Sequence, residues 1–94
     1  MIMIIVSQDK NSLVNLKNIT QIFITECEEE ENSYFIRYEN LDGAYEDLGV
    51  YVTEERAEGV LEEIAEQYEY IETIKYDRTS LRTKDNFIYR MPEE

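Results

Sequence analysis

The feature that most restricts the fold is a single apolar stripe at helical spacing in the second half of the chain. Its members fall at i, i+3, i+4, i+7, i+8 and i+11, and they are Ala57, Val60, Leu61, Ile64, Ala65 and Tyr68. Thr53, just before the stripe, is a good helix N-cap, and Glu54 and Glu55 place negative charge where the helix dipole favours it. The sequence therefore predicts one amphipathic helix over residues 53–69, and further apolar positions beyond it can add a turn.

The rest of the chain has the pattern of short β-strands separated by turns. Its apolar or alternating runs are too short for helices and end at polar residues. These runs are 2–6, 13–16, 20–26, 34–39, 44–51 and 87–91. The strongest turn signal is the segment Asn40-Leu41-Asp42-Gly43, because glycine takes the positive φ that a tight hairpin demands. The sequence predicts an α+β fold with one domain over residues 1–94: an antiparallel meander of five to six strands with one helix packed on one face.

Alternation along the strands predicts which side chains share a face. One strand places three residues together, namely Tyr34, Ile36 and Tyr38. Another is expected to alternate inward at Leu48, Val50 and Val52. The opposite face of the sheet carries aromatic side chains, namely Phe23, Phe35 and Tyr45. One helix covers only one face of such a sheet, so these aromatic residues are expected to remain exposed unless another subunit covers them.

Three stretches of the chain resemble a group of small proteins encoded in phages and prophages of Gram-positive bacteria. They are IVSQDKNSLVNLKNITQIFI near the start, LGVYVTEERAEGVLEEI in the middle and YRMPEE near the end. The resemblance covers most of residues 4–68 and the last few residues. It implies a setting, the cytoplasm of a bacterial host, rather than an activity, and it implies no catalytic or ligand-binding residues.

Negative charge is the largest numerical signal in the sequence. The chain has 22 acidic and 9 basic residues, a net charge of −13. The whole excess lies in residues 1–70, which hold 17 acids and 4 bases, whereas residues 71–94 are balanced. Binding to bare nucleic acid or to an anionic membrane is therefore unfavourable, and the natural electrostatic partner is a basic protein surface.

The candidate partner-binding residues are glutamates in two groups. One group is expected in a hairpin loop and comprises Glu28, Glu29, Glu30 and Glu31. The other lies off the apolar stripe of the helix and comprises Glu58, Glu62, Glu63 and Glu66. Together these carboxylates can occupy the Arg/Lys channel in which a nuclease holds phosphates. By analogy with small acidic phage proteins, we expect a non-catalytic inhibitor of a host nucleic-acid-handling defence protein that acts by nucleic-acid mimicry.

Two other interpretations of the sequence stay open. The acidity can serve solubility alone. The chain can also be a homo-oligomeric structural or regulatory module, with its aromatic sheet face buried in a two-fold dimer.

The residue types needed for catalysis or metal binding are scarce. The chain has no histidine, its one cysteine (Cys27) has no activating base, and it lacks a glycine-rich phosphate loop. Four adjacent glutamates in a loop do not converge on one metal ion. We therefore expect no enzyme activity, no cofactor and no dedicated metal site. The apolar run at residues 1–6 is far too short to span a bilayer, so we expect a cytoplasmic protein.

Overall fold

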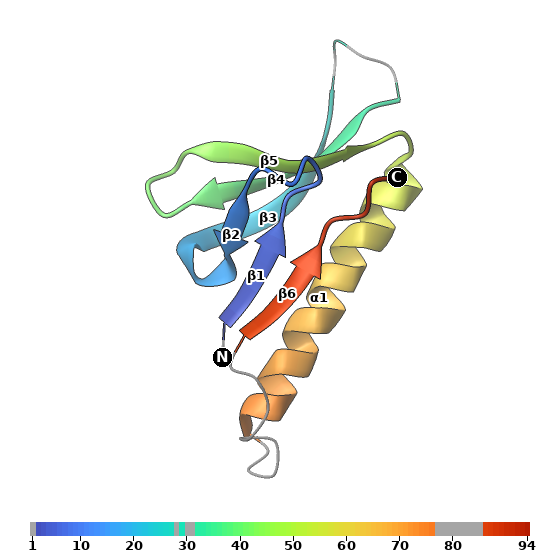
Figure 1. Cartoon of the computed structure of the whole chain (residues 1–94). Helices are drawn as coiled ribbons and strands as arrows, with labels where there is room; N and C mark the ends of the chain where they lie inside the picture. The colour runs from blue at the N-terminus through green and yellow to red at the C-terminus, as the bar shows by residue number, and fades with distance from the viewer. Residues whose placement is uncertain (1, 28, 30–31, 77–85) are drawn as a thin grey trace.

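The computed structural model describes residues 2–27, 29, 32–76 and 86–94, and these residues form six strands, one α-helix and one 3-10 helix (Figure 1). The strands are β1 (Ile2–Val6), β2 (Leu13–Asn15), β3 (Ile19–Glu26), β4 (Tyr34–Asn40), β5 (Tyr45–Tyr51) and β6 (Asn86–Arg90). The helices are η1 (Leu16–Asn18) and α1 (Glu54–Tyr76). The predicted α+β class, with its strands and single α-helix, is confirmed, and α1 extends seven residues beyond the predicted end.

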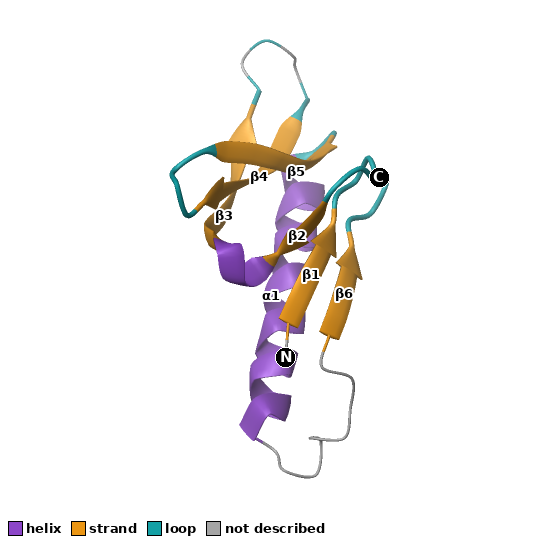
Figure 2. Ribbon diagram, turned by 60° about the vertical axis from the view of Figure 1, so that its left-hand side comes forward, coloured by secondary structure: helices purple, strands orange, loops and turns teal. Residues whose placement is uncertain are grey.

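The described strands form two three-stranded sheets. In the β3-β4-β5 sheet, consecutive strands pair antiparallel through hairpins, as in the predicted meander. In the β2-β1-β6 sheet, β1 pairs antiparallel with β2 and parallel with β6, which comes from the other end of the chain. Figure 2 shows α1 beside both sheets and extending well past the β3-β4-β5 sheet.

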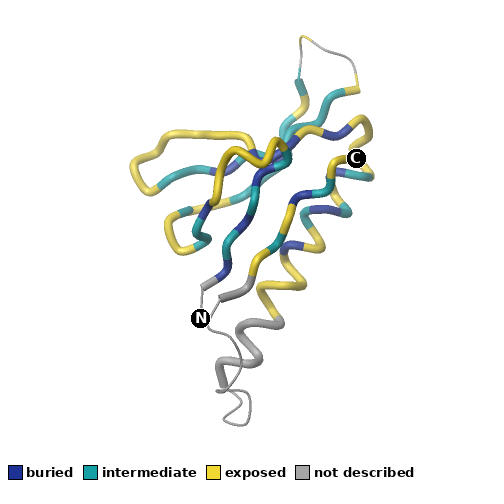
Figure 3. The backbone as a smooth tube through the Cα atoms, viewed as in Figure 1, coloured by how far each residue is buried: buried dark blue, intermediate teal, exposed yellow. Residues whose placement is uncertain are grey.

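The core lies where the two sheets meet α1, and the buried segments gather there (Figure 3). Its largest fully buried side chains come from both sheets and the helix, and they are Ile5, Ile36, Leu48 and Val60. The predicted stripe of α1 adds Ala57 and Ile64, whereas Ala65 and Tyr68 at its far end are exposed. The sheets thus cover only part of the apolar stripe.

The predicted inward alternation of β5 is wrong beyond Leu48. Leu48 is 1% exposed, but Val50 and Val52 are 39% and 73% exposed, and Gly49 and Tyr51 are buried instead. The pairing of β4 with β5 skips Leu48, so β5 carries one extra residue at this point. Such a bulge reverses which side chains face the core.

Gln8 connects the two sheets through both its backbone and its side chain. Its N–H donates to the carbonyl of Leu48 at 2.8 Å, and its Oε1 accepts from the N–H of Val50 at 2.9 Å. Its Nε2 lies within hydrogen-bond distance of three carbonyls, those of Val50, Pro92 and Glu93. Because Gln8 follows β1, while its partners lie in β5 and just after β6, this residue holds both sheets together.

We predict that Gln8→Ala destabilises the fold. The substitution removes the side-chain bonds of Gln8 with Val50, which join the two sheets, and its contacts with the carbonyls of Pro92 and Glu93 after β6. We expect the free energy of unfolding to fall by about 2–3 kcal/mol in urea denaturation. Gln21→Ala is the matched control, because the Gln21 amide makes one long contact, 3.5 Å, to Glu39 on the surface. We expect that control to change stability by no more than about 0.5 kcal/mol. Equal effects of the two substitutions would contradict the role of Gln8.

Candidate acidic and apolar interface

A row of carboxylates follows one exposed side of α1. Glu55, Glu58, Glu62 and Glu66 succeed each other at spacings of three or four residues, and all four are exposed. Residues at these spacings are neighbours on a helix surface. The structure therefore brings together three of the four predicted helix glutamates, Glu58, Glu62 and Glu66. We call Glu55, Glu58, Glu62 and Glu66 the acidic row.

Glu63 lies on the flank of the helix next to the acidic row, three residues before Glu66. Its Oε2 accepts a hydrogen bond of 2.6 Å from the Tyr89 hydroxyl of β6. Arg56, two turns earlier on the same side, donates through Nε to the carbonyl of Glu94 at 2.8 Å. This side of α1 is therefore attached to β6 and to the segment that follows it. Glu63 anchors the helix in the fold.

The predicted loop glutamates follow β3. Glu29 is exposed, and Glu28, Glu30 and Glu31 lie outside the described residues. At the base of this loop, the N–H of Cys27 donates to the carbonyl of Ser33 at 2.9 Å.

A polar hollow of about 490 Å³ lies between this hairpin and the start of α1. Asn32 and Tyr34 line it from the hairpin, and Glu55 and Glu58 of the acidic row line it from the helix. The hairpin and the first half of the acidic row therefore border the same hollow.

The acidic row has little positive charge nearby. Two ion pairs join described residues, Lys10 with Glu93 at 3.0 Å and Arg37 with Asp47 at 2.7 Å, and neither includes a glutamate of the row. Arg56 is the one basic residue in the stretch 54–69. Its guanidinium points to the segment after β6, where Nε donates to the backbone oxygen of Glu94, and it forms no ion pair with the row. The carboxylates of the row therefore present a negative potential to solvent.

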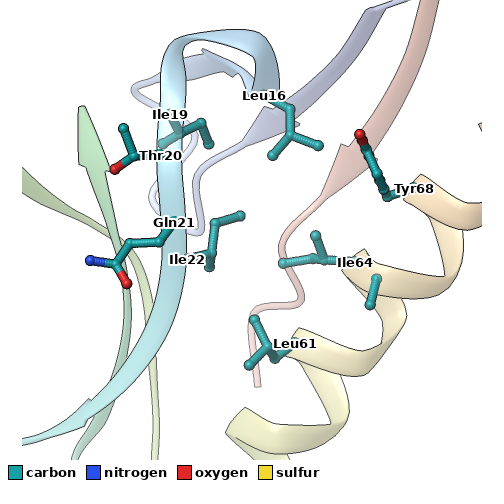
Figure 4. Close-up of a pocket in the computed structure, with 9 residues that line it drawn as sticks. Leu16, Ile19, Thr20, Gln21, Ile22, Leu61, Ile64 and Tyr68 are labelled. Carbon is teal, nitrogen blue, oxygen red and sulfur yellow. The ribbon is translucent and has the colours of Figure 1, made fainter. Parts of the chain in front are cut away.

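An apolar groove of about 440 Å³ runs beside the acidic row, between β3 and α1 (Figure 4). Its lining residues are Leu16, Ile19, Thr20, Gln21 and Ile22 on one side, and Leu61, Ile64, Ala65 and Tyr68 on the other. In Figure 4, Leu16 and Ile22 point toward the helix, whereas Thr20 and Gln21 point away from it. This groove was not predicted from the sequence. Its signal was the length of the apolar stripe, which continues to Tyr68 beyond the part that the sheets bury.

The outer face of the β3-β4-β5 sheet carries the predicted aromatic residues. The rings of Phe23 and Tyr45 pack edge to face with centroids 5.7 Å apart, and Tyr45 is 54% exposed. The Arg37 guanidinium lies 6.0 Å from the Phe35 ring centroid and pairs with Asp47. This face therefore combines exposed aromatic surface with a charge pair that is already satisfied.

The described residues include many carboxylates and one thiol. Among them, no group of three or more His, Cys, Asp or Glu side chains is placed to hold a metal ion. Cys27 is a free, half-buried thiol. Within the same ranges, no helix is both long enough and apolar enough to cross a membrane.

Comparison of the chain with protein-family models, with curated proteins and with solved structures finds no match in any of the three. The resemblance to phage and prophage proteins therefore stays a prediction.

We predict that the fold loses stability between pH 10 and about pH 12, because three tyrosine hydroxyls are favoured in their neutral form. Burial, aided by a hydrogen bond to Glu46, raises the pKa of Tyr38 to about 12. Burial likewise raises the pKa of Tyr51 to about 12, and it raises the pKa of Tyr89, which also donates to Glu63. A raised pKa contributes stability that is fully present below the unfolded value of 10 and is lost as the pH rises through the folded value.

Urea denaturation on either side of pH 10 measures this loss, and Tyr38→Phe tests its origin. The free energy of unfolding is compared at one pH below 10 and at one pH between 10 and about 12. It should fall less in Tyr38→Phe than in the parent protein, because the variant lacks one of the ionising groups. An unchanged pH dependence in Tyr38→Phe would contradict the assignment of Tyr38.

Proposed function

We propose that this protein is a non-catalytic acidic module that binds a basic surface on another protein, a surface that otherwise holds nucleic-acid phosphates. The observation that carries the proposal is the acidic row, four exposed carboxylates on one side of α1 with no basic partner among the described residues. A net charge of −13 disfavours nucleic acid and anionic lipid as direct partners. It favours Arg/Lys-rich protein surfaces, and it accelerates encounter with them.

The spacing of the row supports a coarse form of nucleic-acid mimicry. Glu58, Glu62 and Glu66 are four residues apart, so their charges follow the helix axis at intervals of about 6 Å. One strand of DNA carries a charge about every 3.4 Å along its axis. The row alone therefore has roughly half the axial charge density of one strand. Glu29, which is exposed in the hairpin that borders the polar hollow, supplies further charge in the proposed interface.

The setting implied by the sequence resemblance narrows the partner class. Small acidic proteins of phages often act on host defence nucleases, and we propose the same role here by analogy of size and charge. In this proposal the partner is a nucleic-acid-handling defence protein in the bacterial cytoplasm, and the module blocks its phosphate-binding channel.

We predict that the partner binds through the acidic row in a salt-sensitive way. The immobilised protein is used to capture partners from a bacterial lysate, and mass spectrometry identifies them. The triple variant Glu58→Lys/Glu62→Lys/Glu66→Lys should weaken binding of the captured partner by about a hundred-fold or more, because it reverses the charge of the row. Raising the salt concentration or adding double-stranded DNA should also displace the partner.

The control is a second triple variant with the same change in net charge, Asp42→Lys/Glu93→Lys/Glu94→Lys. These three acidic residues are exposed; one lies in the turn between β4 and β5, and two follow β6. If both triple variants weaken binding equally, net charge rather than the row determines it. A partner that high salt and DNA leave bound would overturn the proposal.

The outer aromatic face of the β3-β4-β5 sheet supports a second candidate, a homodimer. Tyr45 and Val50 are exposed there, and the pairing of Arg37 with Asp47 leaves this face less negative than α1. A second copy can pack on this face without its acidic row facing the acidic row of the first copy.

We predict that light scattering detects a concentration-dependent dimer if this face is the contact. Tyr45→Lys should then shift the protein to monomer, because a charge replaces an exposed ring at the centre of the contact. Tyr68→Lys, a matched change of an exposed tyrosine on α1, should leave the dimer intact. A parent protein that stays monomeric at high concentration would remove this candidate.

A further inference from the structure

Strand β3 forms one edge of its sheet. Its hydrogen-bonded neighbour is β4, and no other described strand pairs with its outer side. An edge strand presents unpaired N–H and C=O groups to any chain that lies beside it. The pairing of β3 with β4 shifts between Ile19 and Gln21 and is regular from Gln21 to Glu26, so this edge has the geometry that another strand needs from Gln21 onward.

The apolar groove lies along this edge. Four consecutive residues of β3, Ile19 to Ile22, line the groove, a length of about 13 Å. The opposite wall is the exposed end of the apolar stripe on α1, where Tyr68 is 47% exposed. A groove between an edge strand and a helix offers main-chain hydrogen bonds on one side and apolar surface on the other.

The rim of the groove on the helix side is acidic. Leu61 and Ala65, which line the groove, are each followed by a glutamate of the acidic row, Glu62 and Glu66. A chain in the groove therefore meets apolar side chains below it and carboxylates beside it.

We propose that this groove binds an extended segment of the partner protein, which adds a fourth strand to the β3-β4-β5 sheet. Its apolar side chains fill the groove, and its Lys or Arg side chains pair with the acidic row. Addition of a strand to an exposed sheet edge is a common way for a domain to bind a peptide. The inference rests on the proposed function, since it uses the same acidic row, and it adds the conformation and chemistry of the bound segment.

Charge and hydrogen bonding select this occupant over two others. A second copy of the chain on β3 would bring a second acidic row toward the first, and like charges that face each other across an interface oppose binding. A partner helix could fill the groove, but it would leave the N–H and C=O groups of the β3 edge without main-chain partners. An extended segment with basic and apolar residues supplies both main-chain partners for the β3 edge and positive charges for the acidic row.

Selection from a displayed library of random peptides tests the chemistry of the segment. Peptides of about ten residues, longer than a typical strand, are selected on the parent protein. We expect enrichment of sequences that combine apolar residues with Lys or Arg. Failure to enrich any sequence, or enrichment of acidic ones, would overturn the inference.

A pair of matched variants tests the position of the selected peptide. Ala65→Arg places a long cation in the groove, and Ala65 is exposed, so the fold should tolerate the change. Gln67→Arg adds the same charge at another exposed position of α1, outside the groove lining. We expect Ala65→Arg to lower the affinity for the peptide by about ten-fold or more in fluorescence polarisation. Gln67→Arg should leave this affinity within about two-fold of the parent value. Equal effects would place the peptide elsewhere.

N-methylation of the peptide tests its conformation. Two versions of one selected peptide carry N-methyl groups on its odd or on its even amides. A strand donates to one neighbour through alternate residues only, so one version should lose at least about ten-fold in affinity and the other should retain most of it. Equal losses in both versions would exclude an added strand.

The same variants separate failure of this inference from failure of the proposed function. If the captured protein partner is lost in the Glu58→Lys/Glu62→Lys/Glu66→Lys variant but binds Ala65→Arg normally, the acidic row functions without the groove and the inference is wrong. If neither variant weakens that partner, the proposed function fails as well. A dimer of the parent protein that Ala65→Arg abolishes would assign the groove to a second copy and overturn the choice of a partner segment.

Discussion

The arrangement of the whole molecule depends on the hydrogen bonds of Gln8. Each sheet has three described strands, and a sheet of that size needs a second layer to bury its apolar face. Gln8 fixes the two sheets to each other, and glycine at position 49 eases the close approach, because a Cβ there would lie in a tight contact 3.1 Å from the Cβ of Gln8. The Tyr51 hydroxyl adds a bond of 2.7 Å to the carbonyl of Pro92 beside it. α1 packs against strands of both sheets, and this packing determines which side of the helix faces solvent.

Local patterns predicted the elements of this fold, and long-range contacts determined their assembly. The helix start was predictable because the Thr53 hydroxyl accepts from the N–H of Arg56 at 3.1 Å, three residues away. The hairpin turn was predictable because Gly43 takes a φ of 89°. The pairing of β1 with β6 joins opposite ends of the chain, and no local pattern encodes it. The extra residue at Leu48 depends likewise on the register with β4, so it reversed the expected exposure of Val50.

In the candidate interface too, local patterns predicted some features and long-range contacts determined the others. Helical spacing was enough to place Glu58, Glu62 and Glu66 in one row. It was not enough to separate Glu63, because the contact with Tyr89 exists only where β6 packs against α1. The groove arises from a mismatch between two elements, an apolar stripe that continues to Tyr68 and sheets that stop short of it. Only the assembled structure reveals that mismatch.

The acidic row is an inefficient way to make a protein soluble. Like charges three or four residues apart destabilise a helix by about 0.2–0.5 kcal/mol per pair, and Glu55, Glu58, Glu62 and Glu66 form three such pairs. The same charges dispersed over both sheets would give the same net charge without this repulsion. On the neighbouring flank of α1, Glu63 and Arg56 each have a hydrogen-bond partner, and they hold the helix so that the row stays exposed. A basic ligand would remove the repulsion within the row, so part of its binding free energy is already present as strain in the free protein.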